Sequence, residues 1–262
     1  AHPVHHDISW LWHSGFMGFL RRTSASNSMD AVLVRMGYGE SRRARYKYFY
    51  VDGSKPKPRL RGVSHEILFA LTPVIGACML APCRTQCAAL GASIFTVCWG
   101  IQYGVSSQFH RRCWTLAEEQ FMSDLDHVAI LFMVAGCYAP LLMLLPVWEQ
   151  FVGLVTICFF LVMGTMHAFG TRGGRGAETS MYVAMVAFLA PAVPQLYARC
   201  TAWESLLHVL ALVQYLVGGV AYVNHWPEPI PGTFGSQDVM HLLTCTGSAA
   251  VFVMNRSVVA RL

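Results

Sequence analysis

Three short stretches of this chain carry side chains that can hold a metal ion or move a proton. Ser106 and His110 stand four residues apart, as do Gln237 and His241, and Asp126 lies between the two pairs in the sequence. On an α-helix, residues four apart share one face. A catalytic zinc ion typically has three protein ligands and one water, and a nearby carboxylate can orient that water. These residues therefore indicate a candidate zinc site.

The elements that must position these residues are long apolar segments. Hydrophobic residues make up 55% of the 262 residues and charged residues only 13%, whereas soluble domains contain about 25% charged residues. Apolar stretches of about 20 residues, the length that crosses a bilayer, recur almost to the C-terminus. We predict seven transmembrane helices, at 65–82, 87–106, 126–146, 150–169, 179–198, 203–224 and 238–257. The expected fold is an all-α, multi-pass bundle in a membrane.

Residues 1–62 differ in composition from the remainder of the chain. They hold eleven of the 19 lysine and arginine residues but only four acidic residues. A basic block can bind nucleic acid, but its place directly before the first apolar segment favours a juxtamembrane segment. We therefore divide the chain into a basic, mostly extra-membrane arm over 1–62 and a membrane domain over 63–262, and expect no nucleic-acid partner.

The distribution of lysine and arginine predicts the orientation of the bundle. With the N-terminus in the cytosol, the cytosolic side carries 15 of these residues and the other side carries four. This bias predicts a cytosolic N-terminus and a non-cytosolic C-terminus. The same topology brings a set of polar side chains to one depth in the inner leaflet: His65, Ser106, His110, Asp126, Gln237, Asp238 and His241.

Helix ends also attract polar residues for reasons unrelated to metals. The headgroup region is wet, and Ser or Asp at a helix start can cap backbone N–H groups. Ser236 or Asp238 could cap the last helix in this way, and Asp126 could complement a helix dipole. Spacing alone therefore leaves both interpretations open, a metal site and ordinary helix starts.

Several motifs, in order along the chain, carry a resemblance to a known family. KPRLRGVSHEILFAL leads into the first helix, and SSQFHRRCW and SDLDHVAILFMVAGCYAPLL contain Ser-x3-His and Leu-Asp-His segments. GGVAYVNHWPEPIPGTFGSQDVMHLL joins the sixth helix to the seventh. Over about residues 55–255 the chain resembles the haemolysin III / progestin and adiponectin receptor family of seven-helix membrane proteins.

This resemblance implies a zinc site in the inner leaflet, shared with membrane hydrolases that act on amide bonds of lipids such as ceramides. Four positions match the residues of that family: Ser106, His110, Asp126 and His241. Gln237 departs from it, because the family has histidine there, and an amide oxygen is a weaker zinc donor than imidazole. Asp238 or His65 could supply the missing ligand.

One function that follows is a zinc-dependent hydrolase of membrane lipids. Zinc on His110, His241 and a weak third donor at Gln237 would lower the pKa of a bound water. Asp126 would act as general base or orient that water, and Ser106 would stabilise the oxyanion or the metal-bound water.

The alternative is a non-catalytic receptor or regulator on the same fold. Its metal site would be degenerate, and its signal would pass through the basic arm. A pore or transporter finds little support, because the polar residues gather at one face of the bilayer rather than along it. Membrane lipids are the expected partners of either function, as substrate or as ligand.

Overall fold

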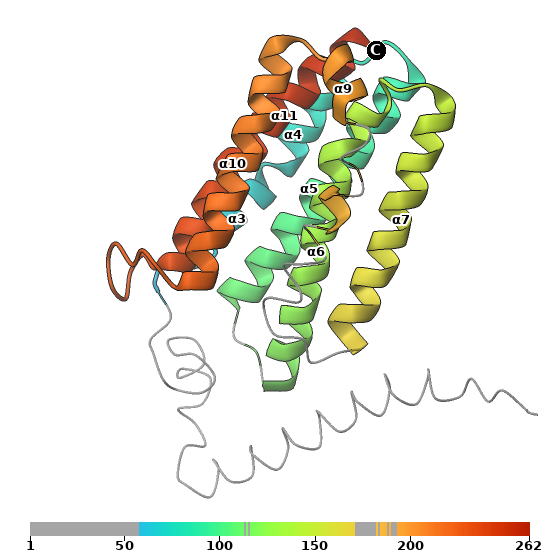
Figure 1. Cartoon of the computed structure of the whole chain (residues 1–262). Coiled ribbons are helices and arrows are strands. Elements are labelled where there is room, and N and C mark those ends of the chain that lie inside the picture. Colours follow the sequence, from blue (N-terminus) through green and yellow to red (C-terminus); the bar gives the residue numbers. More distant parts are fainter. Residues whose placement is uncertain are drawn as a thin grey trace, which may run out of the picture.

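The computed structural model describes residues 58–112, 114, 116–170, 182, 184–187, 189 and 193–262. Within these residues every regular element is a helix, apart from one isolated β-bridge between Ile230 and Phe234. The helices are α3 Val63–Ala70, α4 Thr72–Leu80, α5 Gln86–Arg111, α6 Leu116–Leu142, α7 Val147–Gly170, α9 Val193–Arg199, α10 Ala202–Asn224 and α11 Ser236–Arg261 (Figure 1).

Five of the described helices are long and apolar enough to cross a membrane, or six if α3 and α4 form one bent span. Large apolar side chains such as Phe159 on α7 and Leu216 on α10 are exposed on the outside of the bundle. Lipid tails are as apolar as these side chains, so such faces are compatible with contact with a bilayer. The predicted all-α membrane fold is confirmed, whereas the count of seven and the orientation stay predictions. The predicted span 179–198 lies mostly outside the described residues.

Several predicted helix ends differ from the observed ones, and two differences concern the candidate site. The span predicted at 87–106 continues to Arg111, and the one predicted at 126–146 begins at Leu116. Hydropathy locates the part of a helix that lies in the membrane, while backbone hydrogen bonding continues through polar residues beyond it. Acidic residues in the first turn of α6 favour that earlier start, because they complement the helix dipole. Asp126 therefore lies inside α6 rather than at its start.

The first membrane segment is broken between α3 and α4, whose axes differ by 47°. Pro73 lies in the first turn of α4. Proline has no N–H to donate to the preceding turn and is well tolerated only at a helix start. The break in the first membrane segment thus coincides with Pro73.

Small residues bring neighbouring helices close together. A Cβ atom on Gly136 of α6 would lie 2.5 Å from the Cβ of Cys98 on α5. A Cβ atom on Gly247 of α11 would lie 2.9 Å from the ring of Tyr215 on α10. Helices in lipid gain association energy from such close packing. The α5–α6 and α10–α11 pairs are accordingly side by side over most of their length (Figure 1).

The beginning and the end of the described chain meet in space. Residues 58–62, which we call the lead-in segment, run directly into α3 and lie against the loop before α11. The backbone N–H of Arg59 donates to the carbonyl of Gly232 at 3.2 Å, and that of Leu60 donates to Thr233 at 3.1 Å. The starts of α3 and α11 and the end of α5 therefore share one end of the bundle.

The opposite end of α11 is held by a buried carboxylate. Glu204, in the first turn of α10, is fully buried. It accepts hydrogen bonds from Ser257 at 2.7 Å and from Arg261 at 2.6 Å, both on α11. The backbone N–H of Thr201 also donates to it at 2.7 Å. A buried charge is stable when it is paired and hydrogen-bonded in this way, so both ends of α11 are anchored.

Gly136→Ala is expected to destabilise the bundle, because the added methyl group must push α5 away from α6. Overpacking of this kind costs about 1–3 kcal/mol. Gly219→Ala on α10 is the matched control, because its Cβ would meet nothing within 4 Å. Thermal unfolding in detergent should give a lower midpoint for Gly136→Ala and an unchanged or higher midpoint for Gly219→Ala. Equal midpoints would contradict the packing described here.

Candidate functional site

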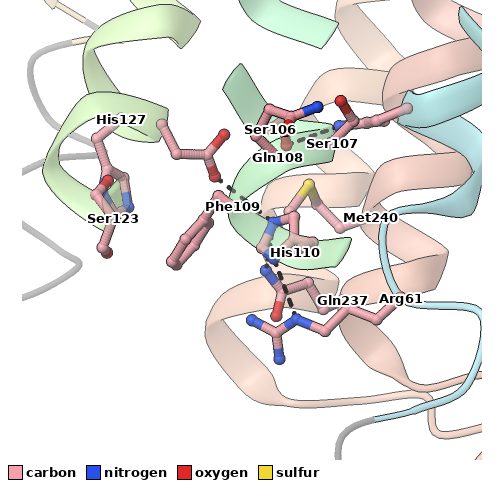
Figure 2. Close-up of polar contacts among 12 residues, drawn as sticks. Arg61, Ser106, Ser107, Gln108, Phe109, His110, Ser123, His127, Gln237 and Met240 are labelled. Carbon is pink, nitrogen blue, oxygen red and sulfur yellow. Dashed lines mark hydrogen bonds and ion pairs between the residues drawn. The ribbon is translucent and has the colours of Figure 1, made fainter. Parts of the chain in front are cut away.

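The structure brings the three predicted stretches together around His110. The Nε2 atom of His110 lies 3.5 Å from Oδ2 of Asp126 on α6 and 3.4 Å from the amide nitrogen of Gln237 on α11 (Figure 2). The ring centroids of His110 and His241 are 4.7 Å apart. The predicted convergence of the segments is thus present, while the catalytic and ligand roles of these residues stay predictions.

His65, from the first turn of α3, adds a fourth segment to this polar cluster. Its Nδ1 atom lies 2.8 Å from the Oγ of Ser106, within hydrogen-bond distance. Its ring centroid lies 4.1 Å from that of His241 and 5.0 Å from that of Tyr103. His65, Ser106 and His241 are all buried. The expectation that His65 lies at the depth of the cluster agrees with this placement.

Arg61 is the member of the cluster that the sequence analysis missed. Its Nε donates a hydrogen bond of 3.1 Å to Nδ1 of His110, and the residue is only 8% exposed. Gln237 lies next to Nε2 of His110 and Arg61 next to Nδ1 (Figure 2). Sequence analysis counted Arg61 only among the basic residues of the arm. The sequence feature that could have indicated its role is its position, directly before Gly62 and the first predicted span.

Gly62 explains how the chain can pass so close to His110. Its φ of 77° lies in the left-handed region that favours glycine. A Cβ atom at this position would lie 2.6 Å from the Cβ of His110. The turn at Gly62 thus aims Arg61 at the imidazole while the chain enters α3.

Asp238 serves the start of α11. Its Oδ2 accepts the backbone N–H of Gly235 at 2.9 Å, and the residue is buried. This is the N-terminal capping role that the sequence left open for it. One oxygen of the Asp238 carboxylate is thus engaged at the start of its own helix, and a role as substitute metal ligand stays a prediction.

Three buried atoms of the cluster have no hydrogen-bond partner among the described residues: His65 Nε2, Asp126 Oδ1 and His241 Nδ1. Buried polar groups normally have a partner, either protein or ordered water. The cluster therefore has polar capacity beyond its internal contacts and can form hydrogen bonds with a small polar group.

A zinc ion does not fit the donor set in this arrangement. Among the described residues, no three His, Cys, Asp or Glu side chains are arranged to hold a metal ion. The Nδ1 lone pair of His110 accepts the Arg61 hydrogen bond. A neutral His110 therefore carries its proton on Nε2 and has no lone pair left to donate. Gln237, the third predicted ligand, has only an amide.

Charge adds to this mismatch. At roughly 6 Å, with an effective dielectric constant of about 20, a +2 ion and a guanidinium repel by about 5 kcal/mol. Structural zinc sites have apparent binding free energies of about 10–16 kcal/mol. Arg61 beside His110 would therefore remove about a third to a half of the binding energy, before any loss of ligands.

Comparison with known proteins agrees with this architecture. The sequence model of the family described as haemolysin-III related matches residues 54–252. This chain belongs to the haemolysin III family. It is 27% identical over 203 residues to Hemolysin-3 of Bacillus cereus, across 72% of this chain and 90% of that protein. The resemblance found in the sequence is confirmed, and the chain is a multi-pass integral membrane protein.

Ser106→Ala is expected to lower stability by about 1–3 kcal/mol, because it leaves Nδ1 of buried His65 without its partner. Ser107→Ala is the matched control on the next residue. Ser107 is equally buried at 1%, but its Oγ donates at 2.9 Å to Gly104 of its own helix. Thermal unfolding should show a clearly larger loss for Ser106→Ala. Losses of equal size would mean that the contact with His65 contributes nothing.

Proposed function

We propose that this haemolysin III-family protein is a non-catalytic membrane receptor or regulator, whose polar cluster works without a metal ion. The observation that carries this proposal is the hydrogen bond from Arg61 to His110. It engages the imidazole that would otherwise be the first zinc ligand. The substitution of histidine by Gln237 supports the same conclusion independently, because an amide is a weak zinc donor.

The ligand proposed for the cluster is a membrane lipid with a polar headgroup. The cluster lies at one end of a bundle whose outer faces are apolar and suited to contact with lipid. His65 Nε2, His241 Nδ1 and Asp126 Oδ1 are buried groups that lack a partner among the described residues. Hydroxyl or amide donors of a headgroup would satisfy such acceptors.

The lead-in segment offers a route from the cluster to the basic arm. Arg61 contacts His110, while its neighbours Arg59 and Leu60 are hydrogen-bonded to the loop before α11. A ligand that binds better to one position of Arg61 would shift the population of lead-in conformations. The arm over 1–62 is the part of the chain that such a shift would reach first.

A lipid amide hydrolase is the second candidate, and one observation favours it. Ser106, His110 and Asp126 lie close together with His241, at the positions where the family resemblance implies catalytic and ligand roles. This candidate requires a metal centre that the present contacts of His110 do not accommodate.

Metal analysis of the purified native chain distinguishes the two candidates. We expect fewer than about 0.1 zinc ions per chain beyond the amount found in His110→Ala. The reason is that the described part of the cluster does not offer three zinc ligands in a suitable arrangement. Release of fatty acid from ceramide-type lipids should equal that of His110→Ala. Stoichiometric zinc, with turnover that His110→Ala abolishes, would overturn the proposal and establish the hydrolase.

Ligand binding without metal gives a positive test of the same proposal. Lipids with hydroxyl- or amide-bearing headgroups should raise the thermal midpoint of the native chain in the presence of a chelator. The increase should be lost in His110→Ala, which removes the centre of the cluster. A shift that appears only with added zinc would contradict a metal-independent receptor.

A further inference from the structure

Arg61 is the strongest fixed positive charge in the cluster. It donates a hydrogen bond to His110, whose other ring nitrogen lies 3.5 Å from Oδ2 of Asp126, and the cluster also contains Asp238. Asp238 is buried and the Asp126 side chain is largely shielded inside the bundle, where an uncompensated charge is costly. A guanidinium keeps its charge under all ordinary conditions. The cluster therefore contains a permanent cation supplied by the chain itself.

We infer that Arg61 is the resident cation of this site and takes the place of the charge of a metal ion. On this inference, zinc is excluded by Arg61 as well as by the presence of Gln237 where the family has histidine. It goes beyond the proposed function, because it names the residue that sets the metal specificity of the cluster. It also makes a prediction that the ligand count alone does not make.

The chemical reason lies in the two nitrogens of His110. An imidazole that binds zinc through Nε2 must carry its proton on Nδ1. Nδ1 would then present N–H toward Arg61 Nε, which also carries a proton, and two donors would face each other at 3.1 Å. Binding through Nδ1 instead would displace Arg61 from its acceptor. Both ring nitrogens of His110 are thus closed to zinc while Arg61 stays in place.

The backbone keeps Arg61 in place. The backbone N–H groups of Arg59 and Leu60 donate to Gly232 and Thr233. These two hydrogen bonds hold the lead-in segment against the loop before α11. Gly62 follows with its left-handed turn against His110. Movement of the Arg61 backbone away from the imidazole would break these contacts. A new ligand at position 237 does not by itself supply that movement.

The test is a set of variants of the full chain measured for zinc content after incubation with zinc. We expect Gln237→His alone to stay below about 0.1 zinc ions per chain at the cluster. The double variant Arg61→Gln, Gln237→His should bind about one, because three imidazoles become available as ligands. Its affinity should exceed that of Gln237→His by about 1000-fold or more, the fold-change that corresponds to the repulsion between the Arg61 guanidinium and a divalent ion.

Two matched controls isolate the charge of Arg61. Arg59→Gln combined with Gln237→His removes an exposed arginine of the same segment and should leave zinc excluded. Arg61→Lys combined with Gln237→His keeps a positive charge and should bind less zinc than the Arg61→Gln double variant. Zinc on the histidines near the N-terminus is removed from the count by subtracting each variant's His110→Ala counterpart.

Stoichiometric zinc on Gln237→His with Arg61 intact would overturn this inference, and that outcome does not depend on whether the double variant folds. Equal zinc on the Arg59→Gln and Arg61→Gln double variants would overturn it as well. The native chain answers a separate question, since zinc in the unmodified protein contradicts the proposed function. Zinc absent there but present on Gln237→His contradicts the role given to Arg61, and the proposed function would then rest on Gln237 alone.

Discussion

A polar side chain buried among membrane helices must find its partners within the protein, because lipid tails offer none. This constraint shapes the end of the bundle where α3 and α11 begin. His65 is paired with Ser106, His110 with Arg61, and Asp238 with the backbone that starts its own helix. The first two pairs join the lead-in segment and α3 to α5, and the third stabilises the start of α11.

The same constraint explains how the fold of one family could hold different cations. Asp126 places a carboxylate deep in the cluster, where a positive charge nearby is favourable. A divalent ion on three imidazoles and a guanidinium on one imidazole both supply that charge. The two cations compete for the same group on the ring. A metal ion coordinates a nitrogen lone pair, and a guanidinium N–H uses that lone pair as its hydrogen-bond acceptor.

Sequence patterns predicted the membrane bundle, the pairs on α5 and α11, and their convergence with Asp126, because helical periodicity and span length fix which residues share a face and a depth. They failed at the start of α6, where the helix continues into polar sequence. They also missed Arg61, because counting charges treats an arginine beside a membrane as facing water. The hydrogen bonds of Arg59 and Leu60 to Gly232 and Thr233 join residues far apart in sequence, which no local pattern reveals.

The meeting of the first and last described helices has a consequence for biosynthesis. The chain is made from its N-terminus, so His65 and His110 enter the membrane before α11 exists. Until Gln237 and His241 arrive, these imidazoles lack the neighbours that surround them in the finished protein. The cluster therefore forms last, and it is fully buried only once α11 has packed against the earlier helices.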